Sequence, residues 1–319
     1  MSAFSTYFSP PTCTHAPAPV PITEAQQEHL KALEVHFGAA KYDLPVKELA
    51  QGRTELTQRE MMFLSRETFV RFLTATKGDL SATITRLEDC LVWRRTEQID
   101  DFDHLADTCE EEARTGKNFV LGYSNKRQPI IYFFPNRNTT PLENRRPIHA
   151  VFMLERASDL MCDGVTNVVV IFNFAGKREG PPTSISAARQ TLHILSHYYP
   201  ERLGLCVFQN MPWIVKTFVS LMWPFVDPNT KKKVLFGSAE GGEIMKNGAV
   251  NAGQLMKEGG GTLDMPYNHD VYWPALLDTC KKLRSEEEER WRGLGEPKVG
   301  REERSFKRSS HTSDDPSDP

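Results

Sequence analysis

The sequence predicts an α/β fold in which a helical N-terminal module precedes a mixed or largely parallel β-sheet. The first observation is the run 168–174, VVVIFNF, whose β-branched and aromatic residues are typical of a strand buried on both faces. The second is the alternation of such strands with helical segments, which requires crossover connections. The third is the helical spacing of four earlier apolar residues, Leu80, Ile84, Leu87 and Leu91.

Composition indicates a globular protein with an ample core. The chain has 319 residues, of which 39% are hydrophobic and 25% charged, and its net charge of −3 gives no reason to expect a nucleic-acid partner. Its six cysteines are scattered, which favours buried thiols in a reducing compartment. We find neither a secretory signal nor an apolar run of about 18 residues that would span a bilayer.

The N-terminal third divides into two predicted parts. Residues 1–22 are rich in Pro, Ser, Thr and Ala and are expected to form a disordered arm. Residues 23–115 are expected to form the helical module. Thr23 and Gln26 have capping-box spacing before a helix to about residue 37, Asp79 is a good N-cap for the next long helix, and 102–114 is a further helix.

Residues 116–284 are predicted to form the α/β domain. We expect strands at 118–123, 130–134, 168–174, 203–208 and 234–236, with helices at 148–161, 185–198 and 270–283. Another helix, strongly apolar, is expected to open at Pro212 and to break at Pro224. Residues 285–319 are charged, have little to bury and are predicted to be a disordered tail.

The stretch 197–233 is the most informative for function. Glu201, in a Tyr-Pro-Glu-Arg corner, and Lys233 bracket the apolar helix and are candidates to meet over a ligand. From the residues alone, Glu201 is equally suited to pair with Arg202 or a nearby helix. The basic triplet 231–233 also fits a solvated charge run, and the apolar helix also fits a piece of core.

Motifs for catalysis or cofactor binding are absent from the sequence. There is no G-x-S-x-G elbow and no G-x-G-x-x-G after a strand, and the residues before Gly176 do not form a phosphate loop. His193 and His197 are spaced for one helix face but have no evident third metal ligand. We therefore expect no enzyme, no catalytic residue, no cofactor and no bound metal.

Several ordered segments carry a resemblance to a known family. They include RFLTATK, LEDCLVWRR, LGYSNKRQPIIYFFPNRN, LHILSHYYPERLG and PWIVKTFVSLMWPFVDPNTKKKVLF. The chain resembles the CRAL-TRIO lipid-binding and transfer proteins, and within them the fungal phosphatidylinositol transfer proteins of the azole-tolerance (pleiotropic drug resistance) subgroup. This resemblance implies a sheet that floors a large apolar pocket and a lid helix that closes it over one bound lipid.

The resemblance also implies a set of site residues. The inositol headgroup would be held by residues at five matching positions: Glu201, Lys233, Thr230, Lys77 and Arg202. The acyl pocket would be lined by four lid residues and three floor residues: Phe218, Leu221, Met222, Phe225, Val168, Val170 and Phe172. Val168 and Val170 stand where phosphatidylcholine-binding relatives have hydroxyl side chains, which would exclude a choline headgroup.

Simple physical chemistry agrees with these implied roles. Burying a methylene is worth about 0.8 kcal/mol, so a carried lipid requires a closed pocket with an apolar lid. Lys233 is a compact cation suited to phosphate, whereas the Glu201 carboxylate only accepts hydrogen bonds and suits inositol hydroxyls.

Three functional hypotheses follow. The first is a non-enzymatic carrier that exchanges phosphatidylinositol between phospholipid membranes and presents it to lipid kinases. The second is a carrier chiefly of a sterol or another apolar lipid, with a vestigial inositol site. The third is an α/β enzyme that acts on lipids, which the missing nucleophile motif argues against. The expected location is the cytoplasm, with peripheral contact to the endoplasmic reticulum, lipid droplets or cell periphery.

Overall fold

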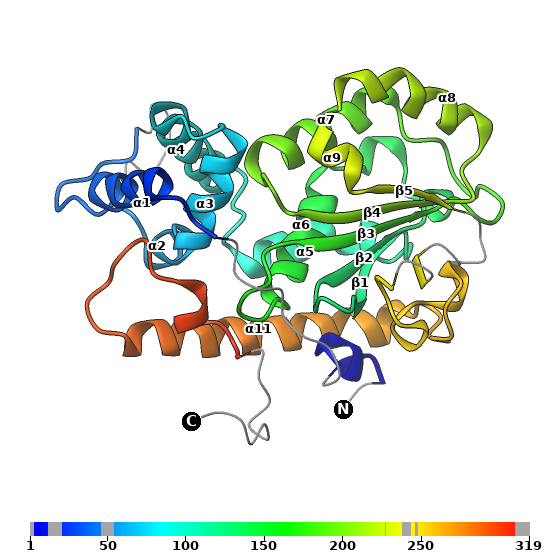
Figure 1. The fold of residues 1–319 in the computed structure, drawn as a ribbon. Helices are drawn as coiled ribbons and strands as arrows, with labels where there is room; N and C mark the ends of the chain where they lie inside the picture. The colour runs from blue at the N-terminus through cyan, green and yellow to red at the C-terminus, as the bar shows by residue number, and fades with distance from the viewer. Residues whose placement is uncertain are drawn as a thin grey trace.

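The molecule has a helical lobe and a sheet-containing lobe, with one long helix running beneath both (Figure 1). The computed structural model describes residues 3–11, 21–45, 54–226, 228–237, 244–245 and 248–309. Within the second lobe, α7 and α8 lie on one side of the sheet and α11 runs along the other. The predicted α/β class is therefore confirmed.

The helical lobe follows from its caps and its apolar spacing. Its helices are α1 Glu24–Phe37, α2 Gln58–Phe63, α3 Arg66–Ala75 and α4 Leu80–Thr96. Thr23 and Gln26 form the predicted capping box, and the Asp79 side chain accepts a hydrogen bond from the amide of Ala82. Leu87 and Leu91 are fully buried in the core of this lobe, as their spacing predicted.

The sheet has five strands in the order β1-β2-β3-β4-β5. The strands are β1 Asn118–Tyr123, β2 Pro129–Phe133, β3 Val168–Asn173, β4 Leu203–Gln209 and β5 Val234–Gly237. Strands β1 and β2 are antiparallel, whereas the other three pairings are parallel. The connecting helices are α5 Phe102–Ala113, α6 Ile148–Asp159, α7 Ile185–Tyr198, α8 Trp213–Met222 and α9 Pro228–Lys232, and α11 is His269–Gly293.

Short 3₁₀ helices occupy several connections. They are η1 Ala3–Phe8, η2 Pro135–Arg137, η3 Leu142–Asn144, η4 Trp223–Phe225, η5 Ala252–Gln254, η6 Lys257–Gly259 and η7 Glu303–Ser305. Of these, η1 and η7 lie within the two ends that were predicted to be disordered.

The N-terminal end differs from the predicted disordered arm 1–22. Phe4 and Phe8 of η1 are buried, and both rings meet Tyr272 of α11 edge-on, at centroid distances of 5.4 and 5.8 Å. Two buried aromatic side chains offset the entropy of ordering this short segment. Residues 12–20 of the predicted arm lie outside the described residues.

The C-terminal end also differs from the predicted tail 285–319. Helix α11 continues to Gly293 because Arg284, Glu287 and Trp291 extend its buried face. Residues 294–309, here called the C-terminal strap, then fold back against the helical lobe. The amide of Gly300 donates to the carbonyl of Leu64 at 2.7 Å. Residues 310–319 lie outside the described range.

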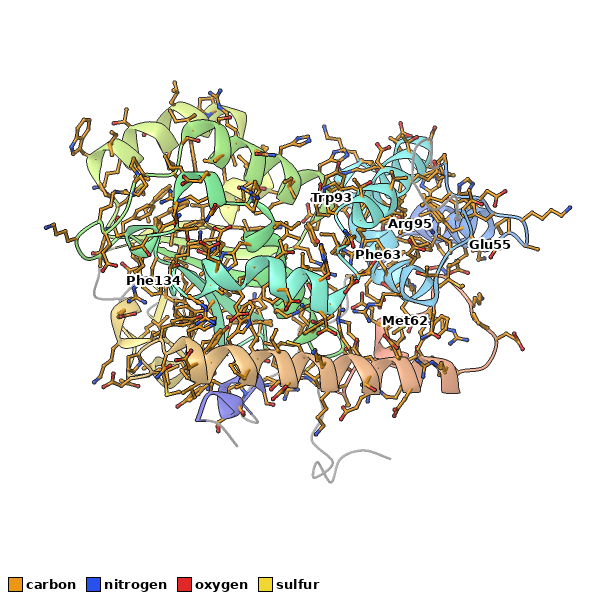
Figure 2. All side chains as sticks on the ribbon, turned by 180° about the vertical axis from the view of Figure 1, so that it is seen from behind. Glu55, Met62, Phe63, Trp93, Arg95 and Phe134 are labelled. Carbon is orange, nitrogen blue, oxygen red and sulfur yellow. The ribbon has the colours of Figure 1, made fainter. Side chains whose placement is uncertain are left out.

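A small separate core anchors the C-terminal strap. Phe306 and Trp291 pack with Met62 of α2, which lies where the helical lobe faces α11 (Figure 2). Val299 enters the main core of the helical lobe. The strap thereby connects the two lobes, a role that its charged composition did not indicate.

Candidate functional site

The Tyr199–Arg202 corner lies between α7 and β4 and is bound by the helical lobe. Arg71 donates to the carbonyl of Pro200 at 3.1 Å, and Arg86 donates to the carbonyl of His197 at 2.9 Å. Trp93 stacks on Tyr198 with ring centroids 4.2 Å apart. The helical lobe therefore fixes the position of this corner.

Tyr199 belongs to a buried charged network. Its hydroxyl donates to Glu155 Oε1 at 2.7 Å, and Arg94 donates to the same oxygen at 2.8 Å. Burial alone would raise the pKa of the Glu155 carboxyl, but the charge and hydrogen bonds of Arg94 outweigh burial and lower it. The corner thus rests on an ionised carboxylate.

Glu201 has a backbone conformation that non-glycine residues rarely adopt. Its φ of +56° lies in the left-handed region, where strain is commonly found at functional positions. Its Oε2 lies 3.0 Å from Lys233 Nζ, and the two side chains are 36% and 27% exposed. The structure therefore brings the two bracketing residues together at a partly open surface.

Thr230 lies beside this ion pair, on α9. Its carbonyl accepts a hydrogen bond from the amide of Lys233 at 3.0 Å, and Thr230 itself is half-buried. The end of α9 and the start of β5 therefore carry two of the five residues implied for a headgroup site.

The structure does not place Arg202 or Lys77 in contact with the Glu201–Lys233 ion pair. Arg202 donates to the carbonyl of Thr166 at 2.7 Å, whereas the ion-pair partner of Glu201 is Lys233. Lys77 is exposed at the turn between α3 and α4, and its side chain has no hydrogen bond or ion pair with another described side chain. The expectation that Arg202 pairs with Glu201 or contacts a shared ligand is therefore not supported by this geometry.

One face of β3 is incompletely covered, contrary to the prediction of burial on both faces. Val169 and Ile171 are fully buried, whereas Val170 and Phe172 on the other face are half-buried. Val168 begins the same face and is buried at 2% exposure. The side chains that follow it along this face are accessible from the side on which α8 lies.

An aromatic row crosses this face of the sheet. Phe133, Phe172, Phe208 and Phe236 stack in sequence with centroid distances of 4.7, 5.0 and 5.8 Å. Trp223 of η4 meets the last ring at 5.5 Å. The row is an apolar floor under the segment that follows α8.

Helix α8 has the bounds that its two prolines predicted. Pro212 is its N-cap, and the helix ends at Met222, just before the 3₁₀ turn that contains Pro224. Leu221 is 67% exposed, which corrects the expectation that it faces an enclosed pocket. It lies two helical turns from the exposed Ile214 and so shares the outer face.

The side chains of Phe218, Met222 and Phe225, the other predicted lid residues, lie outside those the structure describes. Across the described ranges, no group of three His, Cys, Asp or Glu residues is arranged to hold a metal ion. Among the helices in those ranges, none combines the length and apolarity needed to cross a membrane.

Sequence reasoning missed the buried polar residues that hold the corner. Arg71, Arg94 and Glu155 are 4%, 3% and 6% exposed, but each looked like an ordinary surface residue on an amphipathic helix. The available signal was their position on the apolar face: Arg94 follows Leu87 and Leu91 at helical spacing.

Comparison with known proteins agrees with this architecture. A family model described as the CRAL/TRIO domain matches residues 113–261, and one described as the CRAL/TRIO N-terminal domain matches residues 30–89. The crystal structure of Sfh5 has a TM-score of 0.53 at 17% identity, covering 84% of this chain and 99% of that one. This last similarity concerns the fold alone.

Two curated fungal proteins match most of the chain. A CRAL-TRIO domain-containing protein of Schizosaccharomyces pombe is 35% identical over 294 residues, which cover 91% of this chain but 28% of that longer protein. The phosphatidylinositol transfer protein PDR17 of Saccharomyces cerevisiae is 34% identical over 299 residues, covering 88% of this chain and 83% of the relative. With both domain models matched in order and this coverage, the chain belongs to the CRAL-TRIO family.

Proposed function

We propose that this protein binds phosphatidylinositol and transfers it between membranes, and that Glu201 and Lys233 bind the headgroup. The observation that carries the proposal is the 3.0 Å ion pair between these two side chains, which join a strained corner to the start of β5. The similarity to PDR17, whose name describes phosphatidylinositol transfer, supports the same ligand.

The chemistry of the pair suits a phosphoinositol headgroup. The Lys233 ammonium has three donors for phosphate oxygens, and the Glu201 carboxylate accepts hydrogen bonds from inositol hydroxyls. Because both side chains remain about one third exposed, a ligand can separate them at little cost. Thr230, at the neighbouring turn, is assigned to the same headgroup region.

The apolar floor supports a place for the acyl chains. Val170, Phe172 and Phe208 are half-buried on the side where α8 lies, so an acyl chain there would complete their burial. Val168 and Val170 have no hydroxyl to offer a choline headgroup, which favours selection against phosphatidylcholine. Helix α8, bounded by Pro212 and Pro224, acts as the lid over this space.

The lid side of the molecule fits contact with a membrane surface. Residues 174–237 contain eight Lys or Arg and three Asp or Glu, although the whole chain has a net charge of −3. Trp213 and Ile214 are 77% and 62% exposed on α8, and tryptophan favours the interface between water and lipid. We assign transient peripheral contact to this side, with presentation of the lipid to kinases as a downstream role.

Lipid transfer between two vesicle populations tests the proposal. Labelled phosphatidylinositol, phosphatidylcholine and a sterol are offered in parallel, and lipids that copurify with the protein are identified by mass spectrometry. We expect transfer of phosphatidylinositol without transfer of phosphatidylcholine. Transfer of the sterol alone would overturn the headgroup assignment and leave the apolar pocket with a different ligand.

A further inference from the structure

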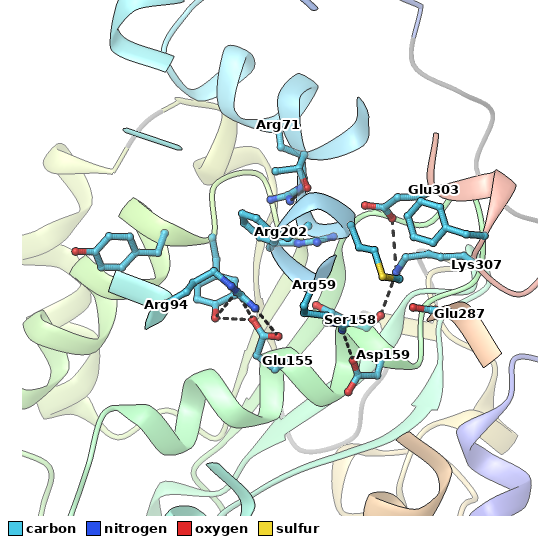
Figure 3. Close-up of a pocket in the computed structure, with 16 residues that line it drawn as sticks. Arg59, Arg71, Arg94, Glu155, Ser158, Asp159, Arg202, Glu287, Glu303 and Lys307 are labelled. Atoms are coloured by element: carbon cyan, nitrogen blue, oxygen red, sulfur yellow. Dashed lines mark hydrogen bonds and ion pairs between the residues drawn. The ribbon is translucent and has the colours of Figure 1, made fainter. Parts of the chain in front are cut away.

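A polar cavity lies at the junction of the helical lobe, the Tyr199–Arg202 corner and the C-terminal strap. Its volume is about 70 Å³. The lining includes five basic side chains from these three regions: Arg59, Arg71, Arg94, Arg202 and Lys307. Four carboxyl groups also line it: Glu155, Asp159, Glu287 and Glu303. Figure 3 shows how the arginines approach one another from different segments.

Most of the carboxylates in this cavity already have cationic partners. Glu155 is bound by Arg94 at 2.8 Å, and Asp159 is bound by Arg156 and Arg284 at 2.8 and 2.9 Å. The Glu303 carboxylate accepts from Ser65 and lies 3.6 Å from Lys307. The charges of Glu155 and Asp159 are therefore largely neutralised by other cations. Burial would raise the pKa of Glu303, but the charges of Lys307, Arg202 and Arg71 lower it, so Glu303 also acts on the two arginines considered next.

Arg71 and Arg202 have only neutral hydrogen-bond acceptors. Arg71 donates to the carbonyl of Pro200 at 3.1 Å and to the Thr68 hydroxyl at 2.8 Å. Arg202 donates to the carbonyl of Thr166 at 2.7 Å. Across the described part of the chain, neither guanidinium lies within 4.0 Å of a carboxylate oxygen.

Arg71 is the more deeply buried of the two arginines. It is 4% exposed, and its Nε is buried without a hydrogen-bond partner. Burial first, and then repulsion from Arg202, lower the pKa of Arg71 to about 9, although Glu303 opposes the shift. The buried Arg71 and the half-buried Arg202 repel each other, and Glu303, which lies more than 4.0 Å from both, compensates only part of this repulsion, so a further anion between them would be favourable.

We propose that this cavity binds one small tetrahedral oxyanion of the phosphate class, held by Arg71 and Arg202 with Lys307 beside them. A buried water needs roughly 10–15 Å³ on a comparable measure, so the cavity has room for several waters, and hence for one such ion. It has no room for a diacyl lipid. Guanidinium groups match oxyanion geometry with paired hydrogen bonds.

The consequence of occupancy is a bridge between three parts of the chain. Arg71 belongs to α3, Arg202 to the corner before β4, and Lys307 to the C-terminal strap. An ion bound only by the folded protein stabilises it by mass action, so phosphate should protect the junction against unfolding.

Thermal unfolding of the full chain with inorganic phosphate tests the site. We expect about 20 mM phosphate to raise Tm by about 3 °C or more relative to chloride at equal ionic strength, and titration calorimetry to give one site per chain. Arg71→Met should abolish both effects, whereas Arg178→Met, which removes an exposed arginine, should preserve them.

Lys307→Met provides a second variant, since Arg71→Met removes a buried contact with the corner and is at risk of misfolding. We expect it to weaken phosphate binding roughly tenfold, and circular dichroism melting checks that the variant still folds after Glu303 has lost its nearest cation. Equal Tm values in phosphate and chloride for the unsubstituted protein would overturn the proposal, and so would unchanged phosphate binding in the folded Lys307→Met protein. Either result would mean that water alone fills the cavity.

Discussion

Replacing Lys233 should weaken binding of the lipid headgroup without changing the stability of the fold. The Lys233–Glu201 pair is partly exposed, and such pairs contribute about 0–1 kcal/mol to folding, so Lys233→Met should unfold at nearly the same temperature as the unsubstituted protein. A hydrogen bond to a charged group is worth about 1.5–3 kcal/mol. Loss of one phosphate contact should therefore weaken binding of phosphatidylinositol roughly 10- to 150-fold.

The assay is vesicle-to-vesicle transfer of labelled phosphatidylinositol, with circular dichroism melting as the check on folding. Lys232→Met is the matched control, because Lys232 is an exposed neighbour of the same type. We expect Lys233→Met and Glu201→Ala to lose most transfer and Lys232→Met to keep it. If Lys233→Met transfers phosphatidylinositol as well as Lys232→Met does, the assignment of the headgroup site to this pair is wrong.

Three further predictions concern the network, the strap and the lid. Glu155→Gln should lower stability by about 1–3 kcal/mol, measured by denaturant titration, because the buried Arg94 loses one of its two carboxylate partners and keeps only Asp100. Since the pKa of Glu155 is lowered on folding from its ordinary 4.5, its contribution is complete above that pH and declines as the pH falls below it, so the Gln variant should show a shallower acid limb. Phe306→Ala should accelerate tryptic cleavage within 301–308, because it empties the small core with Met62 and Trp291. Trp213→Ala should weaken sedimentation with anionic vesicles without changing Tm, because the indole is 77% exposed.

Each of these predictions has a result that would contradict it. A Glu155→Gln protein with unchanged stability would mean that the ion pair merely offsets its own desolvation. Unchanged proteolysis of Phe306→Ala would place the anchoring of the strap elsewhere. Vesicle binding by Trp213→Ala equal to that of the unsubstituted protein would remove α8 as the contact surface.

Much of the fold could be predicted because local signals agree with the tertiary structure. The strand 118–123 and the helix 185–198 have the predicted bounds, and Thr23 and Asp79 cap helices as their residue types favour. These elements are defined by caps and by uninterrupted apolar runs, both of which are visible in a single sequence.

The two ends of the chain could not be predicted in the same way. Their burial depends on partners far away in sequence: Phe8 meets Tyr272, and Phe306 meets Met62. A run such as EEEER looks solvated, although Glu287 within it is 5% exposed. Local composition carries no information about such partners.

In the candidate site, too, one feature could be predicted from the sequence and another could not. The juxtaposition of Glu201 with Lys233 was expected, whereas the divergence of Arg202 from Glu201 was not. The left-handed φ of Glu201 turns the chain, so adjacent residues in sequence project to different surroundings. A backbone angle of this kind cannot be read from residue type when the residue is glutamate.

The C-terminal strap has a consequence for how the protein is made. Its contacts with residues 62–67 join positions about 235 residues apart, as in the hydrogen bond from Arg66 to the carbonyl of Arg301. During synthesis the helical lobe emerges first, and domains generally fold from the N-terminus. Val299 can therefore fill the core of the helical lobe only after almost the whole chain has been synthesised. A chain that ends before residue 299 leaves apolar residues of this core exposed, and chaperones are expected to bind them.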